Sequence, residues 1–157
     1  MNLVRKVGIF LGLDFLMKKL LFEAFILLGW ARIQKSRSFL KVSPLLGEKM
    51  EETPFIYNDK EHKMARRVAE SIHLMSKYTL WESQCLVKAI AAMKMLEKRD
   101  IESTLYLGTS KDTNGKLIAH AWLRTGPYFV TGYEGMEKFT VISSFAKRIK
   151  GSRGELS

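Results

Sequence analysis

Apolar residues dominate the first third of the chain and recur there at helical spacing. The pattern predicts one helix over about residues 2–11, which loosens near Gly12, and a second over about 15–35. Asp14 stands where an N-cap of the second helix would, and its carboxylate can accept a hydrogen bond from a free backbone N–H. The second helix is apolar around most of its circumference, so it has to be buried against other parts of the protein.

The middle of the chain passes from a break to a polar stretch and then to two more helices. Serine, proline and glycine at 43–47 interrupt the N-terminal pattern, and the acidic, polar residues 48–60 are predicted to form a linker. Apolar positions at helical spacing then predict helices over about 60–77 and 80–99. The segment Thr79-Leu80-Trp81-Glu82 has the form of a capping box, which places the start of the last helix there.

After this helix the apolar period changes to that of strands. Strands are predicted over 102–108, 117–124, 128–131 and 138–145. The first two are joined by a turn that contains Asn114-Gly115, the strongest hairpin signal in the chain. Because helices come first and an antiparallel sheet follows, the sequence predicts an α+β fold.

Composition narrows the chemistry that the chain can support. It has 157 residues and one cysteine, so it can bury a core without disulfides, and a multi-cysteine zinc or iron–sulfur site is excluded. A single thiol fits a reducing compartment, and no convincing signal peptide or 20-residue apolar run is present, so we expect a cytoplasmic protein. The net charge of +10, most of it in the first 50 residues, suggests nucleic acid, a membrane surface or an acidic peptide as partners.

One cysteine and one histidine stand where they could form a catalytic pair. Cys85 is predicted near the start of a helix, whose positive end favours a thiolate, and His120 is predicted in the middle of a strand. A helix-borne cysteine facing a strand-borne histidine is the arrangement of cysteine proteases and transglutaminases. The alternative is that Cys85 is an ordinary packing residue and that His120 belongs to the core or the surface.

Longer segments around these two residues carry a family resemblance. The segments WESQCLVKAIAAMKML, STLYLGTSKDTNGKLIAHAWLR and FVTGYEGMEKFTV resemble the leader peptidases of lasso-peptide biosynthesis, a transglutaminase-like, papain-related family of cysteine proteases. The helical segment LLFEAFILLGWARI is similar to the N-terminal part of the same family. The resemblance implies that the chain cleaves the leader from a ribosomally made precursor peptide, without a metal or an organic cofactor.

The resemblance also implies roles for individual residues. Cys85 matches the family nucleophile and His120 the family general base. An aspartate that orients the histidine often follows it by about a dozen residues, but here that place falls near Thr131 and Gly132. Glu134 is the nearest carboxylate, so it is the candidate for the third member, with another polar group or water as the alternative.

The tetrahedral oxyanion of such a reaction needs hydrogen-bond donors. The backbone N–H of Cys85 is the natural one, and the side chains of Gln84 and Trp81 are further candidates. Core packing for Trp81 and a solvated helix face for Gln84 are the competing interpretations. Trp122, two residues after His120, is expected to pack in the core.

Domain organisation and partners follow from the same resemblance. We expect an N-terminal helical segment over 1–47, a linker over 48–60, a transglutaminase-like core over 61–146 and a flexible basic tail over 147–157. Some family members carry a winged-helix module that grips the leader. This chain resembles the split form, which implies a separate small leader-recognition protein, with the ATP-using lasso cyclase as a further partner. The N-terminal helices either dock such a partner or complete the core.

Two other functions remain open at this stage. The same residues would serve an acyl-transfer enzyme such as an amide-forming transglutaminase, in which only the acceptor differs. A non-enzymatic basic module is the other alternative, but the basic residues are scattered and lack a nucleic-acid-binding motif, so no nucleic-acid partner is expected. Peripheral contact of the apolar N-terminal helix with a membrane surface is kept as a less favoured alternative.

Overall fold

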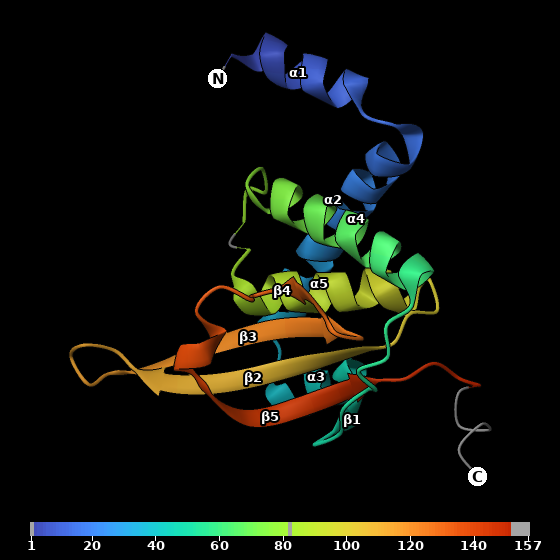
Figure 1. Ribbon diagram of the computed structural model, residues 1–157. Coiled ribbons are helices and arrows are strands. Elements are labelled where there is room, and N and C mark those ends of the chain that lie inside the picture. The colour runs from blue at the N-terminus through green and yellow to red at the C-terminus, as the bar shows by residue number, and fades with distance from the viewer. Residues whose placement is uncertain (1, 82, 152–157) are drawn as a thin grey trace.

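The fold is α+β, as the sequence predicts: helices cover one face of an antiparallel sheet (Figure 1). The computed structural model describes residues 2–81 and 83–151. The helices are α1 (Leu3–Gly12), α2 (Phe15–Lys35), α3 (Phe39–Leu46), α4 (Asp59–Ser76) and α5 (Cys85–Glu97). The strands are β1 (Glu48–Lys49), β2 (Ser103–Lys111), β3 (Leu117–Thr125), β4 (Tyr128–Thr131) and β5 (Thr140–Lys147), with a short 3-10 helix, η1 (Met136–Lys138), before β5.

The sheet has the strand order β1-β5-β2-β3-β4, and every pairing in it is antiparallel. Gly108 of β2 lies opposite His120 of β3. The short strand β4 pairs with β3 only as far as Leu123 opposite Thr131. The chain therefore leaves β4 beside the part of β3 that carries His120.

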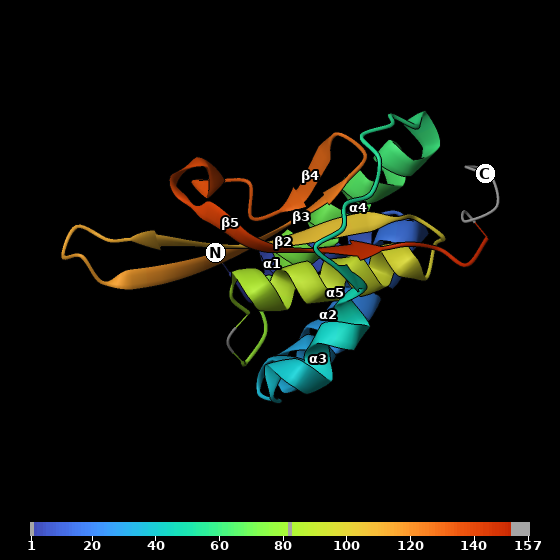
Figure 2. The ribbon, with the colours of Figure 1, turned by 90° about the horizontal axis from the view of Figure 1, so that it is seen from below.

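The core lies between this sheet and the helices α2, α4 and α5, which are layered on one side of it (Figure 1). Seen from below, the turn between β2 and β3 projects beyond these helices (Figure 2). Its fully buried members come from every layer: Leu20 and Leu28 of α2, Val68 of α4, Ile90 of α5, and Leu105, Leu123 and Phe145 of the sheet. Because side chains alternate along a strand, His120, Trp122 and Arg124 leave the sheet on the side opposite Leu123. Helix α2 is thus buried along one side, whereas Phe22, Ile26 and Ile33 on another side are exposed, so its burial is less complete than its apolar sequence predicts.

Two short elements lie where the sequence suggested only a break and a linker. Helix α3 forms in spite of Pro44, which stands in its last turn and lacks an N–H to donate to the preceding turn. Gly47 ends it with a φ of 115°, and β1 then pairs with β5. A two-residue strand and an eight-residue helix leave little periodicity to detect.

The segment that follows β1 is held against the outer face of the sheet by one arginine. Arg124 is fully buried, and its guanidinium donates hydrogen bonds to the carbonyl oxygens of Thr53 (3.0 Å), Pro54 (3.4 Å) and Gly126 (2.8 Å). The ring of Phe55 lies 3.6 Å from the guanidinium carbon. A buried cation that satisfies several carbonyl groups at once fixes the path of this segment.

Helix α5 begins five residues later than predicted, and the expected capping box is wrong. The N-cap is Gln84, whose side chain makes no capping hydrogen bond. The Thr79 hydroxyl instead bonds within the preceding turn, to the carbonyl of Ser76 and the hydroxyl of Ser83. Glu82, the other half of the expected box, lies outside the described residues, as do 152–157 of the expected flexible tail. The later start places Cys85 at the first position of the helix.

Candidate active site

Cys85 is the first residue of α5, and its side chain is half-buried. The first backbone bond of the helix runs from the N–H of Lys88 to the carbonyl of Gln84 (3.0 Å). The N–H groups of the residues before Lys88 in the first turn therefore have no partner within the helix. These N–H groups and the positive end of the helix favour negative charge at this point, whether on a thiolate or on an oxyanion formed beside it.

His120 is held in a defined orientation by the backbone. Its Nε2 atom lies 2.8 Å from the carbonyl oxygen of Gly132. A carbonyl oxygen can only accept a hydrogen bond, so Nε2 carries the proton in the neutral ring and Nδ1 is the free base. The imidazole also stacks on Trp122 (ring centroids 5.8 Å apart) and lies 5.0 Å from the ring of Phe139.

Gly132 can supply this carbonyl because it has no side chain. Its φ is 72°, a left-handed conformation that other residues rarely adopt. A Cβ atom built on it would lie 2.4 Å from the carbonyl oxygen of Ala121 and 2.8 Å from the side chain of Trp122. The absence of a Cβ atom thus lets the chain pass close to β3 and present its carbonyl to the imidazole.

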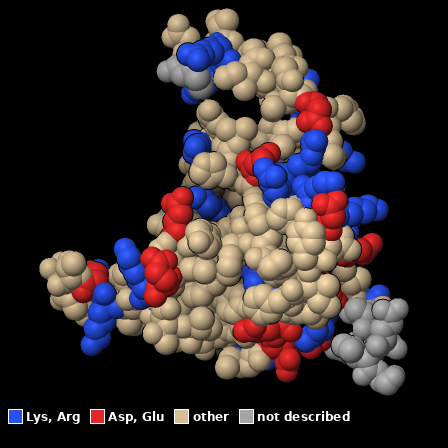
Figure 3. Space-filling model, in the orientation of Figure 1, with Lys and Arg blue, Asp and Glu red and all other residues tan. Residues whose placement is uncertain are grey.

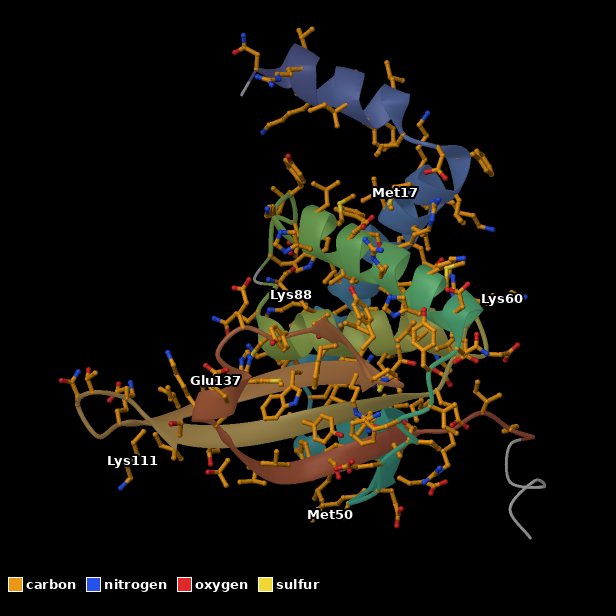
Figure 4. The ribbon with its side chains drawn as sticks, viewed as in Figure 1. Met17, Met50, Lys60, Lys88, Lys111 and Glu137 are labelled. Atoms are coloured by element: carbon orange, nitrogen blue, oxygen red, sulfur yellow. The ribbon has the colours of Figure 1, made fainter. Side chains whose placement is uncertain are left out.

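Cys85 and His120 line one open cavity of about 410 Å³ between α4, the start of α5 and the end of β4. No hydrogen bond joins the thiol to the imidazole among the described residues, but catalytic contacts are often loose in an unliganded protein. Figure 4 shows Lys88 at the end of α5 that faces the loop between β4 and η1. Both residues thus line one cavity, at the edge of β3 that β4 leaves unpaired, although the imidazole leaves the sheet on the face opposite the helix that carries Cys85.

Glu134, the sequence candidate for the third member, lies in the loop after β4 and also lines this cavity. Its side chain is exposed, and the hydrogen bond of His120 Nε2 goes to the Gly132 carbonyl instead. The bond for which the sequence resemblance implies a carboxylate is thus made by a backbone carbonyl. A carbonyl can fix the tautomer of the ring, although it brings no full negative charge.

The two side chains suggested as oxyanion donors lie elsewhere. Trp81 packs on α2: its ring is 5.1 Å from that of Phe25 and lies over Gly29, and its indole N–H is buried without a partner. Gln84 is exposed, and its side-chain oxygen accepts a hydrogen bond from Lys35 (3.4 Å). Neither residue lines the cavity, which leaves the backbone N–H of Cys85 as the donor nearest to the nucleophile.

Three polar side chains of the cavity were not singled out from the sequence. His73 comes from the last turn of α4, Lys88 from the first turn of α5 and Tyr133 from the loop after β4. Lys88 follows Cys85 by three residues, a helical spacing that puts both on one side of α5, so it could have been found from the sequence. His73 carried no such signal, because its place depends on how α4 packs.

One comparison with known protein families matches most of the chain. The family model of the Transglutaminase-like superfamily matches residues 24–144. This range contains α4, α5, Cys85, His120 and the whole sheet from β1 to most of β5. No curated protein and no solved structure gave a significant match.

Proposed function

This chain belongs to the transglutaminase-like superfamily, and from that premise we propose that it is a cysteine peptidase that removes the leader from a lasso-peptide precursor. The superfamily includes cysteine proteases and acyltransferases. The observation that carries the proposal is the shared cavity, which has a thiol at a helix N-terminus and a histidine with a fixed tautomer. Such a pair performs nucleophilic attack on a carbonyl group.

The lasso-peptide substrate is supported by the sequence resemblance. The segments around Cys85 and His120, together with the N-terminal helical segment, are similar to leader peptidases of this pathway. In the split form of that family, a small separate protein binds the leader. We propose that here too a separate protein binds the leader and this chain cleaves it. The cavity of about 410 Å³ is open to solvent, as a site that accepts a peptide chain must be.

In the first half of the proposed reaction, Nδ1 of His120 takes the thiol proton and the Sγ atom of Cys85 attacks the carbonyl carbon at the leader–core junction. The oxyanion is stabilised by the backbone N–H of Cys85 and the positive end of α5. As the C–N bond breaks, His120 returns the proton to the departing amine, which becomes the N-terminus of the core peptide. The leader stays attached to the enzyme as a thioester.

In the second half, Nδ1 of His120 takes a proton from water, and the hydroxide attacks the thioester carbon. The C–S bond breaks, the proton returns to sulfur, and the leader leaves as a carboxylic acid. Throughout both halves the Gly132 carbonyl accepts the Nε2–H bond, so the ring keeps the orientation in which Nδ1 is the reactive nitrogen. The chemistry uses only groups of this chain and water.

The experiment that tests the proposal combines the purified chain, a leader-recognition protein, a precursor peptide from the same biosynthetic system and an added amine. Mass spectrometry then identifies the products. A free leader acid and a free core amine indicate hydrolysis. A leader joined to an added amine, with no free acid, indicates an acyltransferase and overturns the peptidase assignment.

Variants then test the residues. Cys85→Ala and His120→Ala should abolish product formation, whereas His62→Ala, a histidine outside the cavity, should keep it. Cleavage by Cys85→Ala at the wild-type rate would show that another residue is the nucleophile. Circular dichroism of each variant checks that the fold is retained.

A further inference from the structure

Helix α1 makes few contacts with the rest of the protein. None of its residues is buried, and it projects from the body at the N-terminal end of α2 (Figure 1). Its few contacts include the ammonium group of Lys6, 5.1 Å from the ring centre of Tyr78, and Lys18 of α2, which donates a hydrogen bond to the carbonyl of Leu11. A helix of ten residues is marginal in water by itself, and the rest of the chain buries none of this one.

The sequence of α1 separates apolar from charged positions. At 100° per residue, five apolar side chains fall on one side: Leu3, Val4, Val7, Phe10 and Leu11. The positive charges of the helix, Arg5 and Lys6, fall outside this side, with one exposed apolar residue, Ile9, between them. Leu3, Val4 and Leu11 are 76%, 83% and 65% exposed, so the apolar side is open to solvent rather than turned to the core.

Helix α2 continues this exposed apolar character over its whole length. Phe15, Phe22, Ile26 and Ile33 share one side of the helix, and all four are exposed. Buried residues such as Leu20 and Leu28 lie on other sides of α2 and form the core. We call α1 and this side of α2 the N-terminal surface. Exposed apolar side chains that gather on one side of a helix are typical of an interaction site.

The N-terminal region carries an excess of positive charge. Residues 2–47 contain eight lysines and arginines but two carboxylates, Asp14 and Glu23. Both carboxylates form salt bridges of 2.8 Å with arginines from elsewhere in the chain, Asp14 with Arg67 and Glu23 with Arg99. None of the eight cations forms a salt bridge with a described carboxylate. Figure 3 shows basic side chains beside a largely uncharged surface on the projecting helix.

We propose that the N-terminal surface binds an anionic phospholipid bilayer, with α1 lying in the interface. Apolar side chains then enter the boundary of the acyl chains, while lysines and arginines contact the phosphate headgroups, the arrangement of interfacial amphipathic helices. The same charge opposes a second copy of the chain as the occupant, because two surfaces of equal positive charge repel each other. No helix in the described part of the chain is long and apolar enough to cross the bilayer, so the contact is peripheral.

Flotation of the full-length chain with lipid vesicles tests this proposal. We expect it to float with phosphatidylcholine vesicles that contain about 30 mol % phosphatidylglycerol, and to bind pure phosphatidylcholine vesicles much more weakly. Leu3→Gln with Leu11→Gln should remove most of the binding. Arg5→Glu with Lys19→Glu should weaken it by at least about tenfold, and added salt should act in the same direction.

Matched variants on the β2–β3 hairpin serve as controls. Leu117→Gln removes an exposed apolar residue, and Lys116→Glu reverses an exposed charge; both should bind vesicles like the wild type. The proposal is overturned if the wild-type chain stays in solution with both kinds of vesicle, including the case in which it binds only an acidic protein. It is also overturned if the hairpin variants lose as much binding as the α1 variants. Because the test does not depend on catalysis, Cys85→Ala should float like the wild type.

Discussion

The imidazole Nε2 atom of His120 lies 2.8 Å from the carbonyl oxygen of Gly132, twelve residues further along the chain. In many enzymes with a thiol–histidine pair, a carboxylate or amide side chain takes this bond. Here a backbone carbonyl accepts it, and a glycine makes the close approach of that backbone feasible. The geometry links a single missing side chain to the orientation of the proposed general base, and it can be tested directly.

Gly132→Ala should impair catalysis more than a matched glycine substitution. Gly132 and Gly135 have similar positive φ values, 72° and 78°, so alanine costs about 1 to 3 kcal/mol of backbone strain at either place. A Cβ on Gly135 meets nothing within 4 Å, whereas one on Gly132 collides with β3. We expect the kcat of Gly132→Ala to be at least tenfold lower than that of Gly135→Ala. The free energy of unfolding of Gly132→Ala should be equal to or lower than that of Gly135→Ala. Equal kcat values for the two variants would contradict the proposed role of the carbonyl.

Glu134→Gln should retain most of the peptidase activity. The Nε2–H of His120 already bonds to Gly132, and Glu134 is an exposed loop residue. We expect kcat within about twofold of wild type, whereas loss of a true orienting carboxylate costs about 100-fold or more. Glu137→Gln, in the neighbouring 3-10 helix, is the matched control. A large loss confined to Glu134→Gln would make this carboxylate the orienting group after all.

Glu23→Gln should lower stability and flatten its dependence on pH. Glu23 and Arg99 form two hydrogen bonds of 2.8 Å between α2 and the end of α5, and this contact holds the pKa of Glu23 below its ordinary value. A lowered folded-state pKa contributes stability that is present above the unfolded value of 4.5 and is lost as pH falls through the folded value. Urea unfolding at pH 7 should show a loss of about 1 to 3 kcal/mol for the variant.

The difference between wild type and Glu23→Gln should shrink as the pH is lowered below the ordinary carboxyl range. Asp59→Asn removes an exposed carboxylate that pairs with Lys63, and it serves as the control. Because that pair is open to solvent, we expect little change in unfolding at either pH. A constant difference for Glu23→Gln at every pH would show that the variant acts through packing rather than through the ion pair.

Arg124→Met should destabilise the fold strongly. The methionine fills part of the space but leaves the carbonyl oxygens of Thr53, Pro54 and Gly126 without their donor. Thr53 is buried, and a buried acceptor that loses its charged donor contributes to a cost of about 3 kcal/mol in the free energy of unfolding. Arg66→Met, an exposed arginine on α4, should leave unfolding nearly unchanged. Similar unfolding curves for the two variants would show that Arg124 does not secure the segment after β1.

The sequence by itself determined the class of fold and the two residues on which the proposed chemistry rests. The change from helical to alternating period after residue 100, and the Asn114-Gly115 turn, reflect local propensities and burial patterns that any α+β fold has to satisfy. These local signals also predicted β2 to β5 to within a few residues, whereas β1 lies where a linker was predicted. The pairing of Cys85 with His120 came from residue type and a family resemblance, and it remains a prediction about function.

Only the tertiary structure decided how the cavity around these residues is completed. The start of α5 at Cys85, the turn of Gly132 toward His120 and the entry of His73 into the cavity depend on how distant segments pack. The same holds for the segment after β1. Its polar sequence predicts a linker, but in the structure hydrogen bonds from Arg124 hold it against the sheet. A local pattern records which side of an element is buried, whereas contacts between elements depend on shape and on long-range hydrogen bonds that leave no periodic trace in the sequence.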